Sequence, residues 1–293
     1  MKSRSVCCGI FLFNIAAIQK GPIGVFDSGY GGLTVLKSLV RALPAYDFIY
    51  LGDNARAPYG TRSYETVYKY TRSCVDWFFQ QGCPLVILAC NTASAKALRT
   101  IQQQDLQQYG SEKRVLGVIR PTAEIIGSYS QSGHIGILAT PGTVASKSYL
   151  LEIEKFFPAV KVTQQSCPLW VPLIENNEHH TTGAKYFIGD CVQKLLHQDD
   201  QIDTVLLGCT HYPIIEKEIT DSLPPSVRVV TQGDIVADSL QDYLNRHPEI
   251  DKLLNKSGTL SFYTTDEPAD FNEHAPLFFG NEISAAHADI ATA

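Results

Sequence analysis

Short apolar runs alternate with longer amphipathic stretches along most of this chain. The runs are rich in Val, Ile and Leu and lack polar alternation, which is typical of strands buried on both faces of a parallel sheet. The amphipathic stretches between them predict helices that cover such a sheet. The candidate strands are PIGVF (22–26), DFIYLG (47–52), PLVILAC (84–90), VLGVI (115–119), HIGILAT (134–140), KVTQQS (161–166), TVLLGC (204–209) and RVVTQG (228–233).

Helical periodicity is clearest over residues 63–81. Apolar side chains recur there at steps of three and four residues, so that one face is apolar, and Gly82 can end the helix. The residues of that face are Val67, Tyr70, Cys74, Trp77 and Phe78. Towards the C-terminus we expect a helix over 234–244 and a strand in TLSFYTT (259–265).

This order of elements predicts an α/β fold of two similar three-layer domains with mainly parallel sheets. The first domain is expected over residues 21–115 and the second over 116–228. The segment 229–281 is expected to return to the first domain. The Ala-rich tail, 282–293, is expected to be loosely ordered.

The first twenty residues do not fit this alternation. Lys2 and Arg4 precede an apolar stretch, which outlines a short secretory signal but is too short for a membrane span. The rival and favoured hypothesis is an upstream extension with a mis-assigned start. No other segment approaches the roughly 20 apolar residues that a spanning helix needs, so we expect no membrane partner.

Composition narrows the class of partner. The chain has 293 residues, with 24 basic and 30 acidic side chains and a net charge of −6. It has no Lys/Arg-rich run that could track a phosphate backbone, so nucleic acid is not expected as a partner.

Eight cysteines have no C-x-x-C spacing and no dense framework, which favours reduced thiols in a cytosolic enzyme. Cys74, Cys83 and Cys191 are assigned to the core. Cys90 and Cys209 differ from these core cysteines, because each lies where the apolar run of a predicted strand gives way to polar residues. Ligand sites in open α/β sheets lie at the carboxyl ends of strands.

Polar pairs follow both of these cysteines. Asn91-Thr92 comes after Cys90, and Thr210-His211 comes after Cys209. A helix start there is expected to lower the pKa of each thiol towards neutrality, and His211 would favour a thiolate further.

A glycine-rich turn, VFDSGYGGLTVL (25–36), follows the first strand. It fails the G-x-G-x-x-G pattern and lacks the Gly-Lys-Ser/Thr of a Walker A loop. A small carboxylate suits its helix start, while helix capping explains Asp27 and Ser28 equally well. The loop 52–63 brings Tyr59 and Gly60, with a hydroxyl and a backbone N–H, to another strand end, although a plain turn accounts for it too.

Three chemistries could use the two cysteines. Cys90, Cys209 and His211 make an incomplete and unusually spaced zinc set, so no metal is expected. A mechanism with a single nucleophilic cysteine would give the second thiol no role. Two opposed thiols suit racemisation, in which one removes a proton from a carbon and the other delivers a proton to the opposite face.

Six ordered motifs resemble the glutamate racemases of the aspartate/glutamate racemase superfamily, over about 22–242. They are VFDSGYGGLTVL, GDNARAPYG, ACNTASA, IGILATPGTVASKSY, CPLWVPLIE and GCTHYP. The resemblance implies cofactor-independent interconversion of L- and D-glutamate for peptidoglycan, an active site in the cleft between two α/β domains, a homodimer and a cytoplasmic location.

The resemblance also assigns residues. Cys90 and Cys209 are the acid/base thiols; Asp27 assists Cys90, and Glu175 and His211 assist Cys209, with Glu178 as the alternative to Glu175. The residues that match substrate-binding positions are Asp27, Ser28, Tyr59, Gly60, Asn91, Thr92, Thr210 and His211. Aspartate racemase is the nearest alternative. Single-thiol decarboxylases and a small-ligand sensor on the same fold remain further alternatives.

Overall fold

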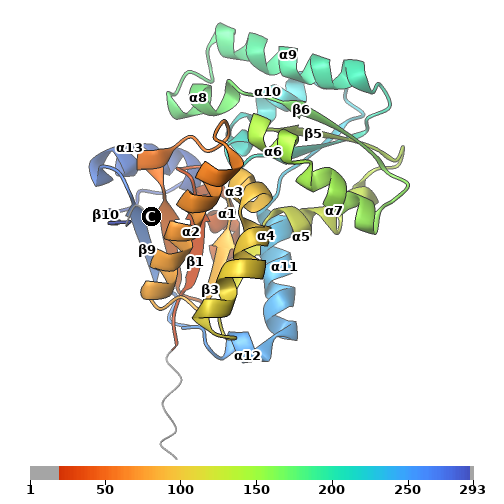
Figure 1. Cartoon of the computed structure of the whole chain (residues 1–293). Helices are drawn as coiled ribbons and strands as arrows, with labels where there is room; N and C mark the ends of the chain where they lie inside the picture. Colours follow the sequence, from red (N-terminus) through yellow and green to blue (C-terminus); the bar gives the residue numbers. More distant parts are fainter. Residues whose placement is uncertain (1–19, 291–293) are drawn as a thin grey trace, which may run out of the picture.

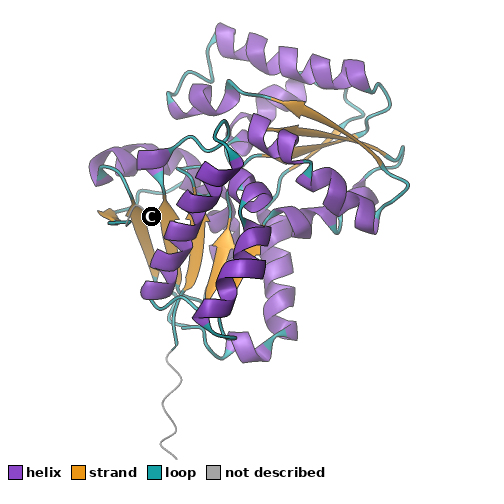
Figure 2. Ribbon diagram, in the orientation of Figure 1, coloured by secondary structure: helices purple, strands orange, loops and turns teal. Residues whose placement is uncertain are grey.

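The computed structural model describes residues 20–290, which form two α/β domains, each built on its own sheet (Figures 1 and 2). All pairings between named strands are parallel, as the unbroken apolar runs predicted. The predicted α/β class with two parallel-sheet domains is confirmed. The N-terminal extension, apart from Lys20, lies outside the described residues.

The first domain is a six-stranded sheet with the order β10-β9-β2-β1-β3-β4. Its strands are β1 (Ile23–Asp27), β2 (Phe48–Gly52), β3 (Leu85–Leu88), β4 (Arg114–Gly117), β9 (Leu260–Thr264) and β10 (Ala285–His287). Its helices are α1 (Leu33–Ala42), α2 (Tyr64–Gln80), α3 (Asn91–Lys96), α4 (Leu98–Thr100), α11 (Gly233–Arg246), α12 (Pro248–Asp251) and α13 (Pro268–Phe279).

Side chains that alternate along β1 separate the two helical layers of this domain. Val25 belongs to a core cluster with Leu36 of α1 and Leu240 of α11, whereas the next residue, Phe26, belongs to a cluster with Phe78 of α2. Successive residues of a strand point to opposite faces. The sheet is therefore covered on both sides, as a three-layer domain requires.

Helix α2 forms as its periodicity predicts. The Ser63 hydroxyl accepts a hydrogen bond from the Thr66 N–H at 3.2 Å and caps the helix start. The apolar face is buried, and Gly82 follows the helix with a φ of 84°, a conformation that glycine adopts at little cost.

The second domain is a four-stranded sheet with the order β6-β5-β7-β8, above the first domain in Figure 1. Its strands are β5 (His134–Ala139), β6 (Lys161–Ser166), β7 (Thr204–Gly208) and β8 (Arg228–Val230). The helices that accompany it are α5 (Ile119–Ala123), α6 (Pro141–Ser146), α7 (Ser148–Phe156), α8 (Trp170–Glu175), α9 (Thr182–Gln198) and α10 (Glu216–Asp221).

Three predicted boundaries need correction. The division at 115/116 falls inside β4, which pairs with β3 as far as Gly117, and the division at 228/229 falls inside β8, which pairs with β7. The loosely ordered tail from residue 282 is wrong for Ala285–His287, which pair with β9 as β10. A short segment such as Ala285–His287 forms a strand because β9 leaves an edge of the sheet open for it. Local sequence does not show that edge, because it depends on the whole fold.

The helices of the described part of the chain are too short or too polar for a membrane span. Between residues 20 and 290, no helix has the length and apolar character needed to span a bilayer.

Candidate active site

Residues that follow strands of both sheets line one cavity between the two domains. Ser28 follows β1 and Cys90 follows β3 in the first sheet, while Thr140 follows β5 and Cys209 follows β7 in the second. The cavity holds about 650 Å³ including its open mouth. The carboxyl ends of the two parallel sheets thus contribute to a single site, where open α/β sheets place their ligands.

Ten of the eleven predicted site residues line this cavity. They are Ser28, Tyr59, Gly60, Cys90, Asn91, Thr92, Glu175, Cys209, Thr210 and His211. The eleventh, Asp27, is fully buried directly behind the cavity wall, where it contacts Thr210.

Cys90 caps the short helix α3. Its sulfur accepts a hydrogen bond from the Ala93 N–H at 3.4 Å and donates to the Ser28 hydroxyl at 3.4 Å. Burial, with a smaller contribution from the negative charge of Asp27, raises the pKa of the Cys90 thiol to about 12. The expectation of a lowered pKa is therefore wrong for Cys90, because exclusion from water outweighs the hydrogen bond from the helix start.

Cys209 lies in a relay with a histidine and a carboxylate. The Cys209 sulfur is 4.0 Å from His211 Nδ1, and His211 Nε2 donates to the Glu175 carboxylate at 2.9 Å. Burial alone would lower the pKa of His211, but its contacts with Cys209 and Glu175 raise that pKa well above 6.5. The direction of this shift favours the positively charged ring, which lies beside the sulfur of Cys209.

The alternative carboxylate for this relay, Glu178, is exposed, whereas Glu175 ends helix α8 at the cavity. Helix α8 is anchored by the buried side chain of Trp170, whose ring lies edge-on to Tyr212 at 4.7 Å. The structure therefore brings Glu175, and not Glu178, to the ring of His211.

The charge on His211 makes its contribution to stability depend on pH. Because its pKa in the folded protein lies above the value of about 6.5 in the unfolded chain, this contribution is complete below about pH 6.5 and is lost as pH rises through the folded pKa. We expect His211→Gln to lower the free energy of unfolding by about 1.5–3 kcal/mol near pH 6. The deficit should shrink as pH rises above neutrality through the folded pKa of His211.

Urea denaturation of both proteins across this pH range measures the deficit. A deficit that grows as pH rises would contradict a charged His211.

Asp27 joins the glycine-rich turn to the second domain. Its carboxylate accepts hydrogen bonds from the Gly29 N–H at 3.1 Å and from the Thr210 hydroxyl at 3.3 Å. Burial raises its pKa, although the positive charge of His211 acts in the opposite direction. The Thr34 hydroxyl also donates to the Thr210 carbonyl at 2.9 Å. The turn therefore buttresses the segment that carries Cys209 and His211.

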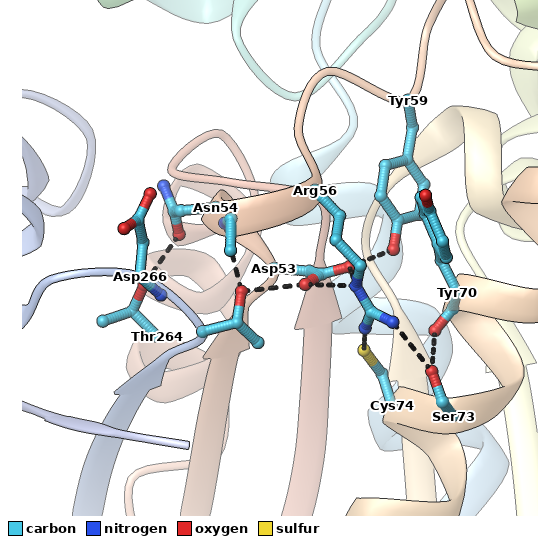
Figure 3. Close-up of polar contacts among 11 residues, drawn as sticks. Asp53, Asn54, Arg56, Tyr59, Tyr70, Ser73, Cys74, Thr264 and Asp266 are labelled. Atoms are coloured by element: carbon cyan, nitrogen blue, oxygen red, sulfur yellow. Dashed lines mark hydrogen bonds and ion pairs between the residues drawn. The ribbon is translucent and has the colours of Figure 1, made fainter. Parts of the chain in front are cut away.

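The Tyr59 hydroxyl has a hydrogen-bond partner within the protein. Figure 3 shows this hydroxyl directed towards Asp53, to which it donates a hydrogen bond, and Arg56 pairs with the same carboxylate at 2.8 Å. This buried network anchors the loop, whose Gly60 carbonyl accepts from the Gly142 N–H at 2.8 Å across the domain boundary. Tyr59 thus forms part of the cavity wall, with its hydroxyl donating to Asp53.

Several cavity residues were not predicted from the sequence. Thr140 and Cys167 line the cavity directly after β5 and β6, and the Thr140 hydroxyl lies 2.9 Å from that of Thr92. Their position after a buried strand, which singled out Cys90 and Cys209, could have found both. The other such residues are Ala57, Pro58, Thr61, Pro141, Pro168, Val171 and Pro172.

Cys90, Cys209 and His211 do not form a metal-binding group in the described part of the chain. Within residues 20–290, no group of three or more His, Cys, Asp or Glu side chains is arranged to hold a metal ion.

Comparison with known proteins gives consistent matches. The model of the Asp/Glu/Hydantoin racemase family matches residues 23–240. A glutamate racemase from Ruegeria pomeroyi is 39% identical over 276 residues, which covers 91% of this chain and 99% of that protein.

Solved structures agree with this match. Glutamate racemase RacE1 from Bacillus anthracis superposes with a TM-score of 0.83 at 33% identity, covering 92% of this chain and 98% of that chain. The glutamate racemase from Francisella tularensis, solved in complex with D-glutamate, gives a TM-score of 0.80 at 32% identity with the same coverage.

Proposed function

This chain belongs to the Asp/Glu/hydantoin racemase family, and we propose that it interconverts L- and D-glutamate with Cys90 and Cys209 as opposed acid and base. The observation that carries the proposal is that these two thiols, which come from separate sheets, line one cavity. The glutamate racemases that it matches, one of them in complex with D-glutamate, support the choice of substrate.

The two thiols have different surroundings. Burial raises the pKa of the Cys90 thiol, which favours its protonated form as a donor, whereas Cys209 has the ring of His211 4.0 Å from its sulfur. One sulfur then takes the proton from the α-carbon while the other delivers a proton to the opposite face. After each turnover the protonation states of the two sulfurs are exchanged.

Stabilisation of the carbanion is the harder task. General acid/base catalysis supplies about 10²–10⁴-fold, so hydrogen-bond donors must also hold the carboxylate on which charge develops. The side chains of Ser28, Asn91 and Thr92 line the cavity next to Cys90 and are the candidates for this. The positive ammonium group of a bound amino acid would also lower the pKa of a neighbouring thiol, which makes proton removal by Cys90 feasible.

Three further proposals accompany this activity. We place the protein in the cytoplasm, because glutamate and the enzymes that consume D-glutamate are found there. We assign to it the supply of D-glutamate for peptidoglycan. A homodimer is the assembly we expect, and light scattering of the purified protein measures it.

Circular dichroism tests the activity directly. Purified protein incubated with L-glutamate should bring the optical signal to zero, D-glutamate should reach the same end point, and L-aspartate should change little. An unchanged signal with glutamate would contradict the proposed function, and faster loss of the L-aspartate signal would favour aspartate racemase. Ammonia and carbon dioxide are assayed in the same mixtures. Deamination would release the first and decarboxylation the second, whereas racemisation releases neither.

A further inference from the structure

A buried glutamine lies at the crossing between the two domains, outside the set of residues assigned above. Gln232 is 4% exposed and lies between β8 of the second sheet and α11, which packs against α1 of the first domain. The chain passes between the domains a second time at Val118, which connects β4 of the first sheet to α5. Gln232 Nε2 lies 3.3 Å from the Val118 carbonyl, so the two crossing segments meet at this side chain.

Gln232 also contacts Asn91, the residue after the thiol of Cys90. Asn91 Nδ2 donates to Gln232 Oε1 at 2.7 Å, and Asn91 Oδ1 accepts from the Tyr149 hydroxyl at 2.6 Å. Gln232 Nε2 in turn donates to the Tyr149 hydroxyl at 2.7 Å and to Thr122 Oγ1 at 2.9 Å. The three side chains form a closed ring of hydrogen bonds.

This ring determines the orientation of the Asn91 amide. The Tyr149 hydroxyl, which accepts from Gln232, has its proton available for Asn91, so the Asn91 atom facing it must be the oxygen. The Asn91 atom facing Gln232 Oε1 must then be the nitrogen. An amide nitrogen carries two N–H groups, and one of them is used by Gln232. The ring does not use the second N–H, and Asn91 is one of the residues that line the cavity.

The ring also spans both domains. Asn91 starts helix α3 of the first domain, and Tyr149 lies on helix α7 of the second. Both are buried, at 2% and 0% exposure, so neither side chain can exchange its partner for water without cost. The orientation of Asn91 therefore depends on how the two domains meet.

From these contacts we infer that Gln232 is a positioning residue that acts through Asn91. Together with Tyr149 it holds the Asn91 amide so that its free N–H donates to a carboxylate of the substrate. The inference rests on the proposed racemase function for the identity of that substrate, but not for the orientation of the amide.

The side-chain amide resonances of Asn91 report its orientation without any turnover. We expect Gln232→Met, which has a similar length and cannot form these hydrogen bonds, to shift both amide proton resonances. Gln102→Met is the matched control, because Gln102 also donates from a side-chain amide, to the Val115 carbonyl at 2.8 Å, but on an exposed helix. Unchanged Asn91 resonances in Gln232→Met would overturn the inference.

A double-mutant cycle then tests whether Gln232 acts through Asn91. We expect Gln232→Met to lower kcat/KM for glutamate by about tenfold to a hundredfold, with a lower kcat as well as a higher KM, because the Asn91 N–H would hold the carboxylate in the bound state and more strongly as charge develops on it. In an Asn91→Ala background the same change should cost less than about twofold.

Equal losses in both backgrounds would overturn the inference, since Gln232 would then act independently of Asn91. Tyr149→Phe, which removes one hydroxyl and keeps the ring, takes the place of Gln232→Met in the cycle if that variant does not fold. A wild-type protein that fails to racemise glutamate would contradict the proposed function, whereas the resonances would still decide the orientation of Asn91.

Discussion

Cys90→Ala and Cys209→Ala are each expected to lower kcat for glutamate racemisation by at least about a hundredfold, and by up to about ten-thousandfold. Each thiol serves one face of the α-carbon, so neither can take over the role of the other. Both side chains line the cavity, and alanine keeps the Cβ of each. Circular dichroism assays that start from L- and from D-glutamate measure the loss in both directions.

Cys83→Ala is the matched control for these variants. Cys83 is also a buried thiol, but it precedes β3 and so lies at the opposite end of the strand from Cys90. Its variant should keep the activity of the wild type and lose only stability. Thermal melts of all the variants show whether they fold. Turnover close to that of the wild type in folded Cys90→Ala or Cys209→Ala would rule out the two-thiol mechanism.

Gly31→Ala should cause the second largest loss. A Cβ at this position would lie less than 3.0 Å from both the His211 ring and the Thr210 hydroxyl, which is closer than van der Waals contact allows. The methyl group must displace the segment that carries Cys209, and a shift of about 1 Å in a catalytic group can cost about a hundredfold in rate. We also expect a destabilisation of about 1–3 kcal/mol from overpacking.

Gly29→Ala in the same turn is the control for this steric argument. Gly29 is buried as well, but a Cβ there would meet its nearest neighbour, Glu175 Oε1, at 3.4 Å, which is ordinary contact. Steady-state kinetics and urea denaturation of both variants should show a large loss for Gly31→Ala and a small one for Gly29→Ala. Similar effects in the two variants would show that the turn does not buttress the catalytic segment.

The sequence predicted those features that depend on local pattern. Strands β1, β3 and β7 follow from unbroken apolar runs and are buried over their whole length, because their sheets are covered on both faces. Cys90 and Cys209 stood out because each follows one of these strands, and the structure places both at one cavity. The same rule, applied to every strand end, would have added Thr140 and Cys167.

Features that depend on burial or on contacts across the fold could not be predicted from local pattern. The Tyr59 hydroxyl donates to Asp53, which is near in the chain, but the local pattern does not show that this carboxylate is buried. The pKa of Cys90 follows from desolvation, which depends on the whole fold rather than on the helix start next to it. Gln232 falls within the predicted strand 228–233, which gives no sign of its role. Its partners Asn91 and Tyr149 lie far away in the chain.

The central claim is that two different thiols serve the two faces of one carbon, and proton exchange with solvent tests it most directly. L-Glutamate is incubated with the protein in D₂O, and the two enantiomers are separated at early times and weighed by mass spectrometry. One sulfur removes the protium, while the other, already exchanged with solvent, delivers deuterium to the opposite face. The account predicts deuterium at the α-carbon of the D-glutamate formed, with the remaining L-glutamate still protiated. Equal deuterium in both enantiomers at the earliest times would mean that one base serves both faces and would contradict the account.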